Sequence, residues 1–132
     1  MTFMQRWFDE VWNKGRESAI DEMAHPDAVA HGLAGEPDVM GVDGFKEFFR
    51  TFQSALTDIR IEVVETITEG DKSAARVIVR GKHTGHALGI PAKGNDIEFS
   101  GVTMARLKDG KLAEAWNYFD FPTMYKQMGS GG

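Results

Sequence analysis

The sequence predicts an α+β fold in which a curled antiparallel β-sheet wraps around a long helix and forms an open cone with an apolar pocket. Apolar residues first recur at helical spacing, most clearly in the aromatic stripe of Phe45, Phe48, Phe49, Phe52 and Leu56. From residue 59 onward, apolar and polar residues alternate with the period of a strand. No helical pattern separates the later strands, so hairpins rather than parallel crossovers should connect them. Because long twisted strands curl, a sheet curled around the aromatic helix leaves one end open.

Helices and a loop precede the sheet. Met4, Trp7, Phe8, Val11 and Trp12 share one helical face. Gly15 is suitably placed to end that helix, and Ser18 can cap a short second helix through about Met23. Residues 29–31 form a short extended piece, followed by a glycine-rich loop that can overhang a pocket. Asp43 is a plausible N-cap for the long aromatic helix.

About four long strands and a terminal helix complete the chain. The expected strands are residues 59–68, 73–84, 97–107 and 112–120. Residues 69–72 and 108–111 read as hairpin turns, while the connection over 85–94 is longer. Pro122 can open a short helix through Met128. We therefore expect one domain over residues 1–128, with residues 129–132 as a flexible tail.

Composition limits the classes of function. The chain has 132 residues and a formal net charge of −5, without a cluster of Lys and Arg, which argues against nucleic acid or anionic lipid as a partner. It has no cysteine, which removes disulfides, thiolate zinc sites and Cys nucleophiles. No signal-peptide pattern or membrane-span length of apolar residues occurs, so we expect a soluble cytoplasmic protein that does not bind membranes.

Four segments carry a family resemblance: residues 41–45, 81–85, 88–94 and 109–116, with Asp120 following. Together they resemble the SnoaL-like polyketide cyclases, which belong to the cone-shaped superfamily of nuclear transport factor 2 and ketosteroid isomerase. The resemblance covers nearly the whole chain. It implies an intramolecular aldol closure of an anthraquinone-type ester, without metal or cofactor, by a carboxylate that moves protons. In the motif, that carboxylate falls on Asp120, while a histidine is expected where Arg106 stands.

Three residues are candidates for catalysis. Asp120 ends an aromatic strand, and apolar neighbours would raise the pKa of its carboxyl toward neutral pH, as a general acid or base requires. The plainer alternative for Asp120 is a helix cap or a surface ion pair. His31 lies at the edge of the glycine-rich loop and could orient a substrate carbonyl or donate to an enolate. Arg106 could stabilise an enolate or bind a carboxylate.

Aromatic and histidine side chains are candidates for binding the substrate. Strand alternation places Trp116, Tyr118 and Asp120 on one face, unless a bulge intervenes. The full set of candidate binding residues is Trp12, Phe49, His83, Phe99, Met104, Trp116 and Tyr118. The alternative for the aromatic residues is ordinary core packing, and for His83 a hydrogen bond across the sheet. His31, His83 and His86 lack an identified carboxylate partner, and the glycines lack a strand-to-helix context, so we expect neither a metal nor a nucleotide cofactor.

The prediction is a small-molecule enzyme that performs cofactor-free acid/base chemistry on an apolar cyclic carbonyl compound such as a polyketide. The reaction could be that of a cyclase, isomerase, dehydratase or hydrolase, because the fold alone does not select among them. A carrier of an apolar ligand and a purely structural dimerisation module are the alternatives. We also expect a homodimer if the outer face of the sheet is partly apolar.

Overall fold

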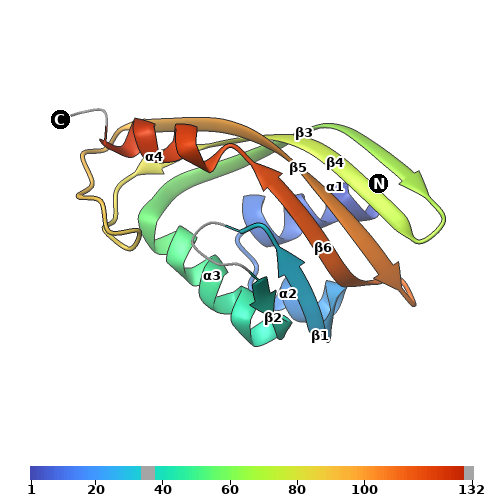
Figure 1. Cartoon of the computed structure of the whole chain (residues 1–132). Coiled ribbons are helices and arrows are strands. Elements are labelled where there is room, and N and C mark those ends of the chain that lie inside the picture. The colour runs from blue at the N-terminus through green and yellow to red at the C-terminus, as the bar shows by residue number, and fades with distance from the viewer. Residues whose placement is uncertain (34–37, 130–132) are drawn as a thin grey trace.

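The computed structural model describes residues 1–33 and 38–129. These residues form one six-stranded sheet with helices on its concave side and at one end (Figure 1). The helical segments are α1 (Phe3–Trp7), a π-helical turn (Phe8–Asn13), α2 (Ser18–Met23), α3 (Gly41–Ala55) and α4 (Phe121–Gly129). The strands are β1 (Ala24–His31), β2 (Asp38–Met40), β3 (Leu56–Glu69), β4 (Lys72–His83), β5 (Asp96–Lys108) and β6 (Lys111–Phe119). The predicted fold class, a curled and open sheet around a long helix, is confirmed.

One strand pairing differs from the antiparallel expectation. The strand order is β2-β1-β6-β5-β4-β3, and within the described residues only β1 and β6 run parallel. β1 also begins at Ala24, five residues before the predicted extended piece. Its pairing with β6 shifts register between Ala24 and Val29, and this irregular stretch accommodates Pro26, which cannot donate to a ladder. The sequence does not reveal this pairing, because strand partners so distant along the chain leave no local pattern.

The aromatic helix α3 forms the floor of the cone (Figure 1). It begins at Gly41 with a φ of 75°, and Met40 is its N-cap without a side-chain hydrogen bond. The prediction that Asp43 is the N-cap is therefore wrong, although its carboxylate in the first turn still favours the helix dipole. The prediction that Ser18 caps α2 is also wrong, because Ser18 is the first residue of the helix and Glu17 is its N-cap. The aromatic stripe of α3 packs into the main core, as its periodicity predicts.

Turns and bulges shape the sheet. Both predicted hairpins occur, and Asp109 and Gly110 have the positive φ values, 53° and 79°, typical of a two-residue turn. β3 shifts register against β4 on either side of its centre, between Thr57 and Arg60 and again beyond Val63. Bulges bend a strand and increase its twist, so these irregularities account for the curl of the sheet over α3.

The terminal helix α4 closes one end of the sheet. Met124 and Met128 are fully buried. The Asn95 side chain donates to the Gln127 carbonyl at 3.0 Å, which ties α4 to the start of β5. Gly129, predicted to begin a tail, is the last residue of the helix, and residues 130–132 lie outside the described residues. None of the described helices is long and apolar enough to cross a membrane.

Candidate functional site

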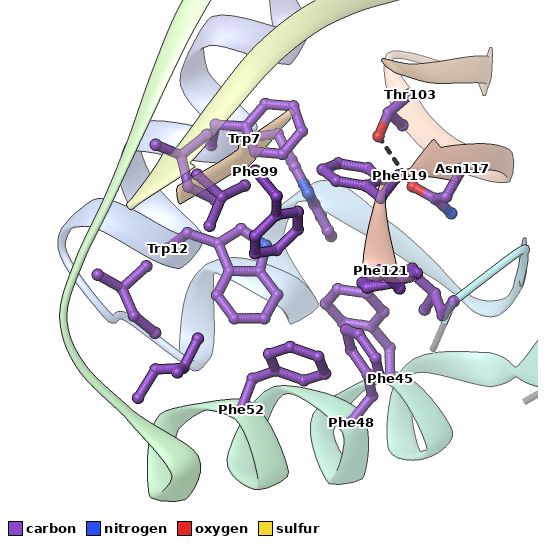
Figure 2. Close-up of a pocket in the computed structure, with 16 residues that line it drawn as sticks. Trp7, Trp12, Phe45, Phe48, Phe52, Phe99, Thr103, Asn117, Phe119 and Phe121 are labelled. Carbon is purple, nitrogen blue, oxygen red and sulfur yellow. Dashed lines mark hydrogen bonds between the residues drawn. The ribbon is translucent and has the colours of Figure 1, made fainter. Parts of the chain in front are cut away.

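An aromatic cavity lies between α3, the N-terminal helical segments and the concave face of the sheet (Figure 2). Its volume is about 70 Å³, counted as the space that the centre of a water-sized sphere can reach. That is several times the roughly 10–15 Å³ that one water molecule needs. The lining residues are Trp7, Phe8, Trp12, Leu33, Phe45, Phe48, Phe52, Leu56, Ile59, Ile61, Val79, Phe99, Thr103, Asn117, Phe119 and Phe121.

Tryptophan 12 is the centre of the aromatic wall. Its ring centroid lies 5.2 Å from Phe49 and 6.2 to 6.4 Å from Phe45, Phe48 and Phe52, at tilted or edge-on angles. Such geometries align the positive edge of one ring with the negative face of another. No ionisable side chain lines this cavity in the part of the chain that the structure describes. The cavity therefore suits a neutral, apolar ligand.

The cavity has one polar end, formed by Thr103 of β5 and Asn117 of β6. The Thr103 hydroxyl donates to Asn117 Oδ1 at 2.8 Å, and Asn117 Nδ2 donates to the backbone carbonyl of His31 at 2.9 Å. Both residues also line a second hollow under α1. The sequence does not single out Thr103 and Asn117, because a polar residue at an inward position looks like any other break in an alternating pattern. One signal in the sequence could have placed Thr103 in the cavity: it lies four residues after Phe99 on β5, so the two side chains share a face of the strand.

Two of the predicted binding residues line the cavity and two others lie in the core. Trp12 and Phe99 are part of the wall, so their predicted contact with a substrate stays a prediction. Phe49 is buried behind Trp12 and does not reach the cavity. His83 is fully buried outside the lining, and neither ring nitrogen has a hydrogen-bond partner among the described residues. The alternative of a cross-sheet hydrogen bond for His83 is therefore wrong as well.

The remaining binding candidates lie on the outer face of the sheet. Met104 is 38% exposed and Tyr118 is 69% exposed, and Trp116 pairs with Met104 across the strands. The prediction that Met104, Trp116 and Tyr118 line the pocket is wrong. A register shift where β5 and β6 begin to pair places both Leu112 and Ala115 inward, which reverses the alternation along β6. Asn117 and Phe119, not Trp116 and Tyr118, thus face the cavity.

His31 and Arg106 also lie away from the cavity, in a charged cluster at the edge of the sheet. His31 Nδ1 lies 2.6 Å from Asp38 Oδ1, and Nε2 lies 2.6 Å from Glu114 Oε2. Arg106 donates to the other Glu114 oxygen at 3.2 Å. The hydrogen bonds that the His31 ring makes to Glu114 and, as the second cause, to Asp38 raise the pKa of His31. The pKa of Glu114 is lowered, first by the hydrogen bond with His31 and then by the one with Arg106. Neither His31 nor Arg106, the predicted catalytic residues beside Asp120, lines the cavity.

Asp120 lies at the rim rather than in the cavity. Its neighbours Phe119 and Phe121 both line the cavity, but the Asp120 side chain is exposed. It accepts the Thr123 hydroxyl at 2.6 Å and the Thr123 backbone N–H at 3.1 Å, and so caps α4. These hydrogen bonds lower the pKa of Asp120, led by the hydroxyl. The expected rise in that pKa is wrong, because water and donors, not aromatic rings, surround the carboxylate.

Comparison with known proteins places this geometry in a family. The nogalonic acid methyl ester cyclase of Streptomyces nogalater is 29% identical over 127 residues, which cover 90% of each chain. The structure of TsrD from Streptomyces laurentii is 27% identical, with a TM-score of 0.83 over 97% of this chain and 92% of that one. A protein from Jannaschia described as SnoaL-like has the same fold, with a TM-score of 0.87 at 22% identity over 97% of this chain and 90% of that one.

The family profile described as SnoaL-like polyketide cyclase matches residues 2–128. This span contains every wall of the aromatic cavity and the rim carboxylate of Asp120. The chain belongs to the SnoaL-like polyketide cyclase family.

Proposed function

We propose that this protein binds a neutral, ring-bearing carbonyl compound in the aromatic cavity and closes a further ring in it by an aldol reaction. The observation that carries the proposal is an aromatic wall without an ionisable side chain among the described residues. The indole N–H groups of Trp7 and Trp12 have no hydrogen-bond partner among the described residues, so they are available to a ligand carbonyl. The family supports cyclase chemistry, since the relative from Streptomyces nogalater is named as the cyclase of nogalonic acid methyl ester.

Asp120 is the proposed acid/base of this reaction. Its carboxylate removes a proton from a carbon next to one carbonyl, and the resulting enolate carbon bonds to a second carbonyl carbon. The alkoxide formed at that centre takes a proton back, so no atom is lost or gained. The rim position of Asp120, between two lining phenylalanines, supports this assignment, because it keeps the charge of the carboxylate outside the cavity. The step requires Asp120 to exchange its bonds to Thr123 for the substrate.

A carrier without catalysis is the second candidate. It is favoured by the state of Asp120, whose carboxylate is held by Thr123 and whose pKa is lowered, which makes it a weak base. The cavity volume of about 70 Å³ also means that a substrate of several rings must displace side chains that line the cavity. A carrier would need this displacement alone, whereas the enzyme would also have to break the bonds between Asp120 and Thr123.

Nogalonic acid methyl ester is the substrate for the decisive experiment. Binding is followed by the fluorescence of Trp7 and Trp12, and ring closure by chromatography of the ester and its product. We expect Asp120→Asn to bind the ester within about twofold of the parent and to close the ring at least about 100-fold more slowly. Thr123→Val, which removes the hydroxyl bond to the Asp120 carboxylate and leaves the backbone one, is the control and should retain ring closure. Ester that binds the parent and is recovered unchanged would select the carrier.

We also propose that the outer face of the sheet pairs with a second copy of this chain. Ile67, Ala74, Met104 and Trp116 form a continuous row across four strands, since each is the register partner of the next. Ile67 is 70% exposed and Tyr118 is 69% exposed. The cross-strand pair of Arg76 with Glu65 flanks this row, and a two-fold axis can bring its charges against the opposite charges of the second copy.

A further inference from the structure

The polar end of the cavity has a hydrogen-bond polarity that its partners fix. The backbone carbonyl of His31 can only accept, so the amide of Asn117 must turn Nδ2 toward it. Asn117 Oδ1 therefore faces Thr103, whose hydroxyl donates its one proton to that oxygen. The reversed amide would set two oxygens against each other at His31.

On the side that faces the aromatic rings, the hydrogen-bonding capacity that remains is that of an acceptor. Thr103 Oγ1 has committed its proton and keeps its lone pairs, and Asn117 Oδ1 keeps a second lone pair. Thr103 is only 4% exposed, so water has little access to its oxygen. In Figure 2 the two bonded oxygens lie beside the Phe119 ring, and the amide nitrogen of Asn117 lies on the side away from the rings.

We infer that the oxygen pair of Thr103 and Asn117 accepts a hydrogen bond from the ligand, so the protein selects ring compounds that carry a hydroxyl or N–H donor. A phenol or an enol of the carbonyl substrate has such a donor. The inference rests on the proposed function in one respect, that the aromatic cavity is the ligand site. In apolar surroundings this acceptor discriminates between ligands, because a ligand without a donor leaves the remaining lone pairs of the two oxygens without a partner.

Three bicyclic probes of nearly equal size test the inference. Indole donates an N–H, indene neither donates nor accepts, and 1-indanone only accepts. Dissociation constants are measured by calorimetry on the full chain. We expect the parent to bind indole about fivefold more tightly than indene, the ratio that one ordinary net hydrogen bond gives.

Two variants assign the effect to the oxygen pair. In Thr103→Val/Asn117→Leu the ratio of indene to indole dissociation constants should fall to about one. In Asn117→Leu alone the Thr103 proton loses its acceptor and becomes available to a ligand carbonyl. The affinity for 1-indanone relative to that for indene should therefore rise about fivefold over the parent. Thermal unfolding of each variant checks that it is folded.

A measurement on the parent needs no variant. With nitrogen-15 indole bound, the N–H proton should shift downfield and show a nuclear Overhauser contact to the Thr103 methyl group. The inference is overturned if indole binds no better than indene, if the double variant keeps the indole preference, or if the N–H proton contacts other side chains instead of Thr103.

Failure of the inference can be told from failure of the proposed function. The probes are not substrates, so an absence of ring closure with the ester leaves their binding ratios unchanged. Conversely, an indole-to-indene ratio of one leaves ring closure by Asp120 measurable.

Discussion

His31 joins three strands at the edge of the sheet through two carboxylates. Its ring nitrogens bind Asp38 of β2 and Glu114 of β6, and its ring stacks on Trp116 at a centroid distance of 5.7 Å. Because both nitrogens meet carboxylates, the doubly protonated imidazolium is the favoured form.

The pH dependence of stability follows from these shifts. The pKa of His31 is raised above its ordinary 6.5, so its stabilisation is complete below about pH 6.5 and is lost as pH rises through the folded-state value. The pKa of Glu114 is lowered below its ordinary 4.5. The stabilisation from Glu114 is therefore complete above about pH 4.5 and is lost as pH falls through the folded-state value. We expect His31→Gln to lower the melting temperature most between about pH 4.5 and 6.5, with a smaller loss at pH 8.5.

His25→Gln is the matched control for that prediction. His25 lies on the same strand but bonds the Lys108 carbonyl and has no carboxylate partner among the described residues. Its substitution removes a histidine from the same strand without breaking a carboxylate pair, so the difference between the two variants reports the bonds of His31 to Asp38 and Glu114. If His31→Gln lowers the melting temperature by the same amount from about pH 5 to 8.5, the folded protein does not stabilise the imidazolium form of His31.

Asp120 gives a second titration prediction. Its carboxyl should titrate below the ordinary value of 3.8, because the Thr123 hydroxyl and backbone N–H stabilise the charged form. Carbon-13 NMR of the side-chain carboxyl measures this pKa, with Asp120→Asn for assignment. Thr123→Val removes the hydroxyl alone and should raise the pKa part of the way. A pKa above 3.8 in the parent would return Asp120 to the desolvated carboxyl that the sequence predicts.

The pairing of β5 with β6 sets one wall of the cavity through Gly101. A Cβ at this position would lie 2.4 Å from the Phe119 ring, so the absence of a side chain lets that ring rest against β5. Phe119 in turn stacks on Phe121 with a centroid distance of 5.8 Å and meets Phe99 edge-on. A displaced Phe119 would therefore disturb the whole aromatic wall.

Gly101→Ala is expected to push Phe119 into the cavity. We expect a loss of about 1–3 kcal/mol in the free energy of unfolding from overpacking. Indole affinity should fall about tenfold or more, since the ring then occupies ligand space. Gly101→Ala/Phe119→Leu is the control and should recover binding. Unchanged indole affinity in Gly101→Ala would show that Phe119 does not limit the cavity.

Local pattern predicted most of these elements. The aromatic spacing of α3 and the turn residues at Asp109 and Gly110 act over a few residues, and both hairpins and the helix form as expected. The site was less predictable, because it depends on which face of a strand turns inward. One register shift near the start of β6 exchanged Trp116 and Tyr118 for Asn117 and Phe119.

At the scale of the whole molecule, the proposed pairing of two copies rests on the row of Ile67, Ala74, Met104 and Trp116 on the outer face of the sheet. We expect a dimer, with a mass in solution near twice the 14.6 kDa of one chain by light scattering. Tyr118→Glu and Met104→Glu place charge on the exposed row and should yield monomers, since burying an unpaired carboxylate is unfavourable. Lys126→Glu on the exposed side of α4 is the control and should leave the mass unchanged. A parent mass of one chain would refute the second copy as partner.

The sequence by itself determined the α+β class, the aromatic helix and the hairpins, and its motifs carried the resemblance to the family. The elements follow from periodicity and turn chemistry, which act over a few residues. Only the tertiary structure decided the parallel β1–β6 pair, the inward positions of Thr103 and Asn117, and the capping bonds of Asp120. The physical reason is that strand register and partner choice depend on contacts between distant segments, and a shift of one residue exchanges the two faces of a strand.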